Sequence, residues 1–159
     1  MRIGSYLFYG LVAFIILVPA GPTNSQNPLR KYQIAGLRDL KDLKVVFQPH
    51  SQNIELLTMK ELDDLITVFL RQKIPKLNPS QHEKVTTWLA LEYRTPPNGG
   101  FIRLVLYRWA IISDTRDELF MAAWDDSRLV TGTPNRQVFK EILESLLTGF
   151  AADYYRANQ

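Results

Sequence analysis

Three consecutive strand-like runs fill the middle of this chain, and they limit its fold more than any other feature. The runs are Thr86–Tyr93, Phe101–Ile112 and Leu119–Trp124, which are rich in apolar, β-branched and aromatic residues. The turn-forming sequence PPNGG, Pro96–Gly100, separates the first two, and a polar stretch that begins at Ser113 separates the last two. Short connections of this kind favour antiparallel pairing between neighbouring strands.

A strand and a helix are predicted before these runs. Val45–Phe47 is a β-branched and aromatic run that Pro49 ends, as expected for a strand. Thr58 and Glu61 have the spacing of a capping box, and apolar residues then recur on one helical face as far as Lys73. This pattern predicts a helix that packs its apolar face on the sheet.

A second helix is predicted after the runs. Thr133 suits the N-cap, Pro134 suits the first helical position, and a wide apolar stripe continues to about Ala157. The element order is then βαβββα. We expect an α+β domain in which an antiparallel sheet of about four strands carries the two helices mainly on one face.

The two faces of this sheet differ in composition when each strand is read at period two. One face is aliphatic and includes Leu119 and Met121, which suits burial under the helices. The other is aromatic and polar, and it contains Phe120 and all three tryptophans of the chain. Aromatic side chains of this kind are typical of protein interfaces and of sugar-stacking surfaces. The candidate binding face comprises Trp88, Arg103, Tyr107, Trp109 and Trp124. The alternative is a second layer of core, reached by a helix that crosses this face or by a β-bulge that shifts one strand's alternation.

The start of the chain has the features of a secretory signal peptide. Arg2 gives a positive beginning, and Tyr6–Val18 is uncharged but short for a membrane-spanning helix. Val18 and Ala20 have the small-residue spacing that signal peptidase accepts, so we expect cleavage after Ala20, with a site nearer Ser25 as the alternative. An uncleaved segment would remain as a membrane anchor.

These signals divide the 159 residues into three parts. We expect residues 1–20 to be the signal peptide, residues 21–36 a flexible leader and residues 37–159 a single α+β domain, since the last part has the length of one domain. The mature protein would then be periplasmic or secreted, without stable insertion in the membrane.

The residues that most often perform chemistry are few. The chain has no cysteine, and His50 and His82 lack metal-ligand spacing. The carboxylates Asp114, Asp117 and Glu118 share one turn, but they do not follow the calcium-loop pattern. A formal net charge of +3 is too small to indicate nucleic acid as a partner. We therefore expect no catalytic residue, no metal and no cofactor.

Three sequence patterns resemble an uncharacterised family of secreted bacterial proteins. They are L-x-x-L-K-x-L-K-V-V from Leu37 to Val46, the LT-x-x-x-L helix from Leu57 to Arg71, and the closing F-x-x-x-Y-x-x-A-N from Phe150 to Asn158. The chain departs from that family at Ala122–Trp124, where the family has Thr-Thr-Trp, and it lacks the Gly-rich stretch that follows. The resemblance implies export but no activity or catalytic residue.

The predicted element order also resembles βαβββα envelope-assembly domains, such as the lipopolysaccharide-assembly lipoprotein and the N-terminal domain of the Tol translocation protein. This likeness concerns fold only. We expect a non-enzymatic domain that binds an envelope protein or a second copy of itself through the aromatic face or an exposed strand edge. The alternative is a protein that binds a glycan or a small amphiphile on the same aromatics, and the third possibility is an enzyme of unrecognised type.

Overall fold

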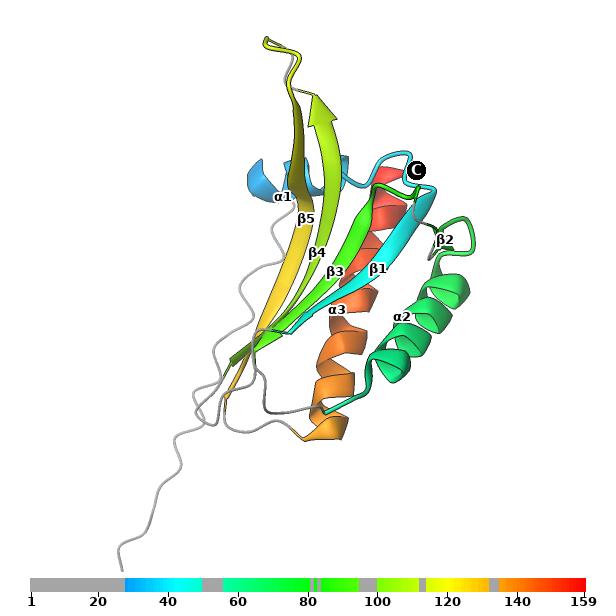
Figure 1. Cartoon of the computed structure of the whole chain (residues 1–159), viewed down its shortest axis with the longest axis vertical. Helices are drawn as coiled ribbons and strands as arrows, with labels where there is room; N and C mark the ends of the chain where they lie inside the picture. Colours follow the sequence, from blue (N-terminus) through cyan, green and yellow to red (C-terminus); the bar gives the residue numbers. More distant parts are fainter. Residues whose placement is uncertain are drawn as a thin grey trace, which may run out of the picture.

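A five-stranded sheet with helices packed against it forms the fold (Figure 1). The computed structural model describes residues 28–49, 56–80, 82, 84–94, 100–111, 114–131 and 135–159. In chain order the elements are α1 (Pro28–Ala35), β1 (Asp42–Pro49), α2 (Met59–Lys73), β2 (Asn78–Pro79), β3 (Trp88–Arg94), β4 (Gly100–Ile111), β5 (Glu118–Val130) and α3 (Arg136–Ala157). The α+β class predicted from the sequence is confirmed.

The sheet has the order β2-β1-β3-β4-β5 and is mixed, not wholly antiparallel as expected. β3, β4 and β5 pair antiparallel, as their short connections predict. β1 instead pairs in parallel with both β2 and β3. The physical reason is that α2 lies between β1 and these strands in the chain, and a helical crossover brings the next strand back in the same direction. β2 has only two residues, too few to show a periodic pattern.

The hydrophobic core lies between one face of the sheet and the helices. Figure 1 shows α3 running behind the sheet, with α2 beside it. The buried side chains of the sheet on this face include Val45, Leu89, Leu91, Leu104 and Leu106. α2 contributes Leu62, Ile66 and Leu70, and α3 contributes a row from Phe139 to Tyr154. The aliphatic face is therefore the helix-covered one in β3 and β4, as predicted.

Both long helices begin at capped residues. The hydroxyl of Thr58 accepts a hydrogen bond from the Glu61 amide at 3.2 Å, and the Thr58 amide donates to the Glu61 carboxylate at 2.9 Å. This confirms the predicted capping box. The predicted start of the last helix is wrong, because α3 begins at Arg136 and the side chain of Asn135 accepts from the Val138 amide at 2.9 Å. Asparagine caps a helix as well as threonine does, so Asn135 can take this role. Thr133 and Pro134 lie outside the described residues.

An additional helix, α1, falls in the segment expected to be a flexible leader, so the described part of the chain has three helices where two were expected. Pro28 opens it, in a position where proline fits a helix. A helix of eight residues is not stable alone, so α1 depends on tertiary contacts for its stability. The guanidinium of Arg30 forms an ion pair with Asp153 of α3, and the Gln33 amide donates to Asp125 of β5 at 2.7 Å. Residues 28–35 are therefore a helix and not a flexible leader. Residues 21–27 of the expected leader lie outside the described part of the chain.

Candidate binding face

Four aromatic rings gather on the sheet face opposite the core, and we call them the aromatic cluster: Trp88, Tyr107, Trp109 and Phe120. The register brings them together, because Trp88 of β3 pairs with Tyr107 of β4, and Trp109 of β4 pairs with Phe120 of β5. The centroid of the Phe120 ring lies 5.0 Å from Trp88, 5.4 Å from Trp109 and 5.6 Å from Tyr107. Trp109 is 52% exposed and Trp88 is 37% exposed, so the cluster presents an aromatic surface to solvent.

A charged network adjoins the aromatic cluster on the same face. The Arg103 guanidinium reaches the Glu92 carboxylate at 3.4 Å and the Asp125 carboxylate at 3.1 Å. The Tyr107 hydroxyl donates a hydrogen bond to Glu92 at 2.8 Å. The network continues to α1 through Gln33, which donates to Asp125. Arg103 and Tyr107, both predicted for the candidate binding face, therefore act together on one carboxylate.

Glu92 is the buried member of this network, with 7% of its surface exposed. A buried carboxylate needs compensating partners, and Arg103 and Tyr107 supply them. Burial, followed by the hydrogen bond and negative charge of Glu92, raises the pKa of Tyr107. Tyr107 thus remains a protonated donor toward Glu92 across the neutral pH range, and the network holds the centre of the face in one arrangement.

Trp124 does not belong to this face, and its assignment to the candidate binding face is wrong. Leu106 pairs with Trp124 and Tyr107 pairs with Ala122, so Ala123 is an extra residue in β5. This β-bulge reverses the alternation of side chains after Ala122. Trp124 is consequently turned toward α3, where it is 1% exposed and its ring packs edge-on against Phe150 at 5.1 Å. Trp88, Arg103, Tyr107 and Trp109 stay on the open face.

β4 and β5 extend beyond the first residue of β3 and form a projecting hairpin (Figure 1). We define the projecting hairpin as residues 108–111 and 118–121, which pair with each other beyond the Trp88–Tyr107 pair. Its large apolar side chains are exposed on both faces: Trp109 and Ile111 on the aromatic side, Leu119 and Met121 on the other. Leu119 and Met121 were expected to be covered by helices. They lie on the predicted face of the sheet, but beyond the part of it that the helices cover. Alternation predicts the face of a side chain, not where the helices lie on that face.

Among the cavities that border the projecting hairpin, two have mainly apolar linings. One, of about 350 Å³, lies beside the aromatic cluster and is lined by Lys44, Val85, Thr86, Trp88, Trp109 and Phe120. The other, of about 570 Å³, opens against α1, and its lining includes Leu29, Tyr32, Arg108 and Met121. Phe120 was assigned to the aromatic face by its alternation, but its central place in the cluster follows only from the register. β3 begins at Trp88, two residues after the start of the predicted run Thr86–Tyr93. Val85 precedes that run, so strand alternation gave no signal for it.

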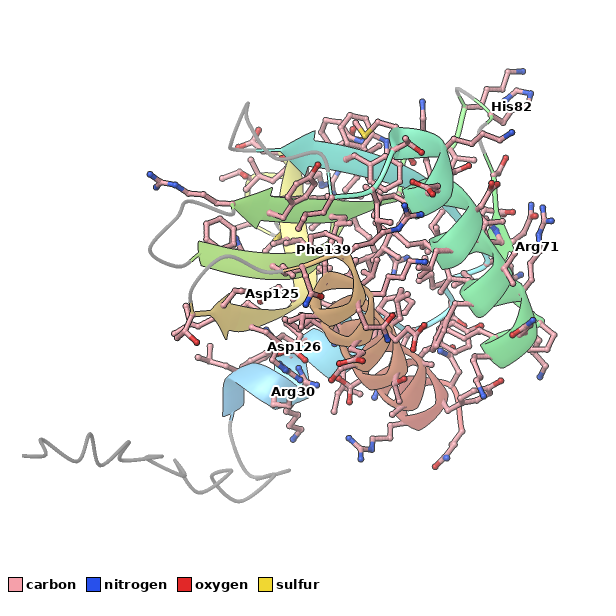
Figure 2. All side chains as sticks on the ribbon, turned by 90° about the horizontal axis from the view of Figure 1, so that it is seen from below. Arg30, Arg71, His82, Asp125, Asp126 and Phe139 are labelled. Atoms are coloured by element: carbon pink, nitrogen blue, oxygen red, sulfur yellow. The ribbon has the colours of Figure 1, made fainter. Side chains whose placement is uncertain are left out.

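His82, considered from the sequence as a metal ligand, lies on the far side of the molecule from β5. Figure 2 shows Arg30, Asp125 and Asp126 at the β5 side of the molecule, while Arg71 and His82 lie at the opposite end, toward α2. His82 is exposed, and His50 is outside the described residues. Within the described part of the chain, no three histidine, cysteine or acidic side chains converge as metal ligands. None of the helices described has the length and apolar character needed to cross a membrane.

The chain was also compared with known proteins. No model of a known protein family matches it, and no curated protein has a significantly similar sequence.

Proposed function

We propose that this protein is an exported, non-enzymatic domain that binds a protein partner in the cell envelope. The binding surface comprises the aromatic cluster and the projecting hairpin. The observation that carries this proposal is the exposure of large apolar side chains on both faces of one hairpin. Isolated exposed apolar residues are ordinary, but a contiguous group marks an interaction site.

A protein partner suits this surface because it can contact both faces of the hairpin and its edge together. β5 is the last strand of the sheet, so its outer backbone groups are available for pairing where α1 does not cover them. A strand added at such an edge gains main-chain hydrogen bonds, while alternate side chains reach the apolar groups on each face. The partner is another envelope protein or a second copy of this chain.

Export is part of the proposal and comes from the sequence. The charge at Arg2, the uncharged run Tyr6–Val18 and the small residues before the expected cut at Ala20 favour secretion. The resemblance to secreted bacterial proteins supports the same location, periplasmic or extracellular. No catalytic role is assigned to any residue.

Site-specific photo-crosslinking in the native envelope tests the proposal. A crosslinking side chain is placed at Leu119 or at Met121 of the full-length chain, and at Arg71 of α2 as the control, because Arg71 lies at the other end of the molecule (Figure 2). We expect both hairpin positions to capture the same protein and Arg71 to capture none. Equal capture at all three positions, or none at the hairpin, would contradict the proposal.

A further inference from the structure

We propose that the 350 Å³ cavity beside the aromatic cluster is a binding site for a small anionic amphiphile, a molecule with an apolar body and one negatively charged head group. This site goes beyond the protein-binding surface. The two share Trp88, Trp109 and Phe120 of the aromatic cluster, but Lys44, Val85 and Thr86 belong to the cavity alone. A volume of this size falls at the lower end of the range for small-ligand pockets.

The lining favours an apolar ligand body. Four of its six residues are apolar or aromatic: Val85, Trp88, Trp109 and Phe120. The Trp88 and Phe120 rings meet edge to face, with 72° between their planes, and Trp109 is tilted 49° from Phe120. The rings therefore form walls at an angle to one another and not a flat stacking platform. An alkyl chain or a small ring fills a space of this shape by burying apolar surface.

The same lining disfavours a glycan. Specific small-ligand pockets fix polar groups of the ligand through well-placed hydrogen-bonding side chains. A sugar carries several hydroxyl groups that need such partners when they leave water. Apart from the two indole N–H groups, which only donate, Lys44 and Thr86 are the polar side chains of this lining. Among the two ligand classes left open by the sequence, the cavity therefore selects the amphiphile.

Lys44 specifies the charge of the head group. Its position in β1 is beside Trp88 in the parallel register, so its ammonium group belongs to the aromatic side of the sheet. No ion pair joins it to a carboxylate among the described residues, and Glu92 and Asp125 on this face are both paired with Arg103. A partly buried ammonium group next to an apolar cavity is stabilised by an anion bound beside it, because few water molecules remain there to solvate the charge.

The surroundings of the cavity are also positive. A neighbouring cavity of about 300 Å³ shares Val85 and Thr86 with it. That second cavity is lined by three cations and two carboxylates: Lys41, Lys84, Arg108, Asp39 and Asp42. The sum over both linings, with Lys44 added, is four positive and two negative charges, which attracts an anion toward this end of the sheet.

Tryptophan fluorescence of the full-length chain tests the site with two probes of equal chain length, laurate and dodecanol, below their aggregation concentrations. We expect laurate to give a saturable change and to bind at least tenfold more tightly than dodecanol. Lys44→Met should weaken laurate binding about tenfold and leave dodecanol binding unchanged. Lys60→Met, at an exposed position of α2, is the matched control and should bind laurate like the parent.

Each contrary result has a definite meaning. Absence of a saturable change with laurate would overturn the site, and equal affinity for laurate and dodecanol in parent and Lys44→Met would overturn the anionic head group. Association with phosphatidylglycerol vesicles without binding of free laurate would show a membrane surface instead of a single-molecule site. Leu119→Ser should retain laurate binding even where it loses crosslinking to the partner, so failure of one proposal is distinguishable from failure of the other.

Discussion

The indole nitrogen of Trp124 donates a hydrogen bond to the carboxylate of Asp153 at 2.9 Å, and both side chains are buried. Asp153 also forms ion pairs with Arg30 of α1 and with Arg156 of α3. One carboxylate thus joins the bulged strand β5 to both neighbouring helices. The bulge that removes Trp124 from the open face therefore has a structural purpose, because it places the indole where α1 and α3 meet.

Removal of this carboxylate should be costly. Asp153→Ala leaves the Trp124 N–H without its acceptor and Arg30 without its ion pair, and breaking a buried pair in this way costs about 3–5 kcal/mol. The free energy of unfolding from denaturant titration measures the effect. Asp64→Ala, at an exposed position of α2, is the control and should change stability by less than about 0.5 kcal/mol. Similar values for the two variants would show that Asp153 does not hold the helices.

Two glycines should respond in opposite directions to substitution by alanine. A Cβ at Gly36 would clash with the backbone carbonyl of Ala123, whose carbon would lie 3.0 Å away, so the chain after α1 must shift away from the bulge. We expect Gly36→Ala to cost about 1–3 kcal/mol. A Cβ at Gly149, inside α3, would meet only the Asp126 side chain at 3.4 Å.

Gly149→Ala should therefore stabilise the protein by about 0.5–1 kcal/mol, because alanine is the better helix former. Thermal unfolding of the two variants, compared with the parent, gives the sign of each change. Equal effects at Gly36 and Gly149 would indicate that the close approach of the chain at Gly36 to β5 is absent in solution.

The start of α2 offers a smaller, local test. Thr58→Ala removes the side-chain acceptor for the Glu61 amide and should cost about 1 kcal/mol. Asn135→Ala at the start of α3 should cost a similar amount. Denaturant midpoints check both values, and a midpoint equal to that of the parent would mean that the corresponding cap is not formed.

The same capping box predicts a pH dependence. The hydrogen bond from the Thr58 backbone lowers the pKa of Glu61, with Arg136 adding a smaller effect. A carboxyl whose pKa is lower in the folded state stabilises the protein above its unfolded-state pKa, and this stabilisation is lost as pH falls through the folded-state pKa. Glu61→Gln should therefore reduce the loss of stability between neutral and acid pH. Parallel stability profiles for variant and parent between pH 6 and pH 3 would contradict this.

Sequence periodicity predicted the helices and strands whose formation depends on residues close together in the chain. The helix from Thr58, the strand around Val45–Phe47 and the alternation of β3 and β4 all have local signals of this kind, and the structure has each of them. The antiparallel pairing of β3 with β4 followed from the short connection between them. Four of the five residues of the candidate binding face therefore lie on the sheet face that alternation assigned to them, while their role in binding stays a prediction.

The errors concern features that depend on distant parts of the chain. The residues around Val45 do not indicate that β1 lies parallel to β3, because this depends on the crossover through α2 between the two strands. The eight residues of α1 are held by Asp125 and Asp153, far away in the sequence. The bulge at Ala123 inverts the direction of Trp124 without any change in residue type, so strict alternation assigned that side chain to the wrong face.

The proposed interface depends most on Trp109, and the decisive measurement combines stability and partner capture on the Trp109→Ala chain. Because this side chain is half exposed, its truncation should change the free energy of unfolding by no more than about 1 kcal/mol. Photo-crosslinking from Leu119 should nevertheless fall at least tenfold, since an exposed aromatic residue at an interface contributes mainly to binding. Trp124→Ala is the matched variant and should cost about 3–5 kcal/mol as a core truncation. A Trp109→Ala protein that stays folded and captures the partner as well as the parent would contradict the proposed interface.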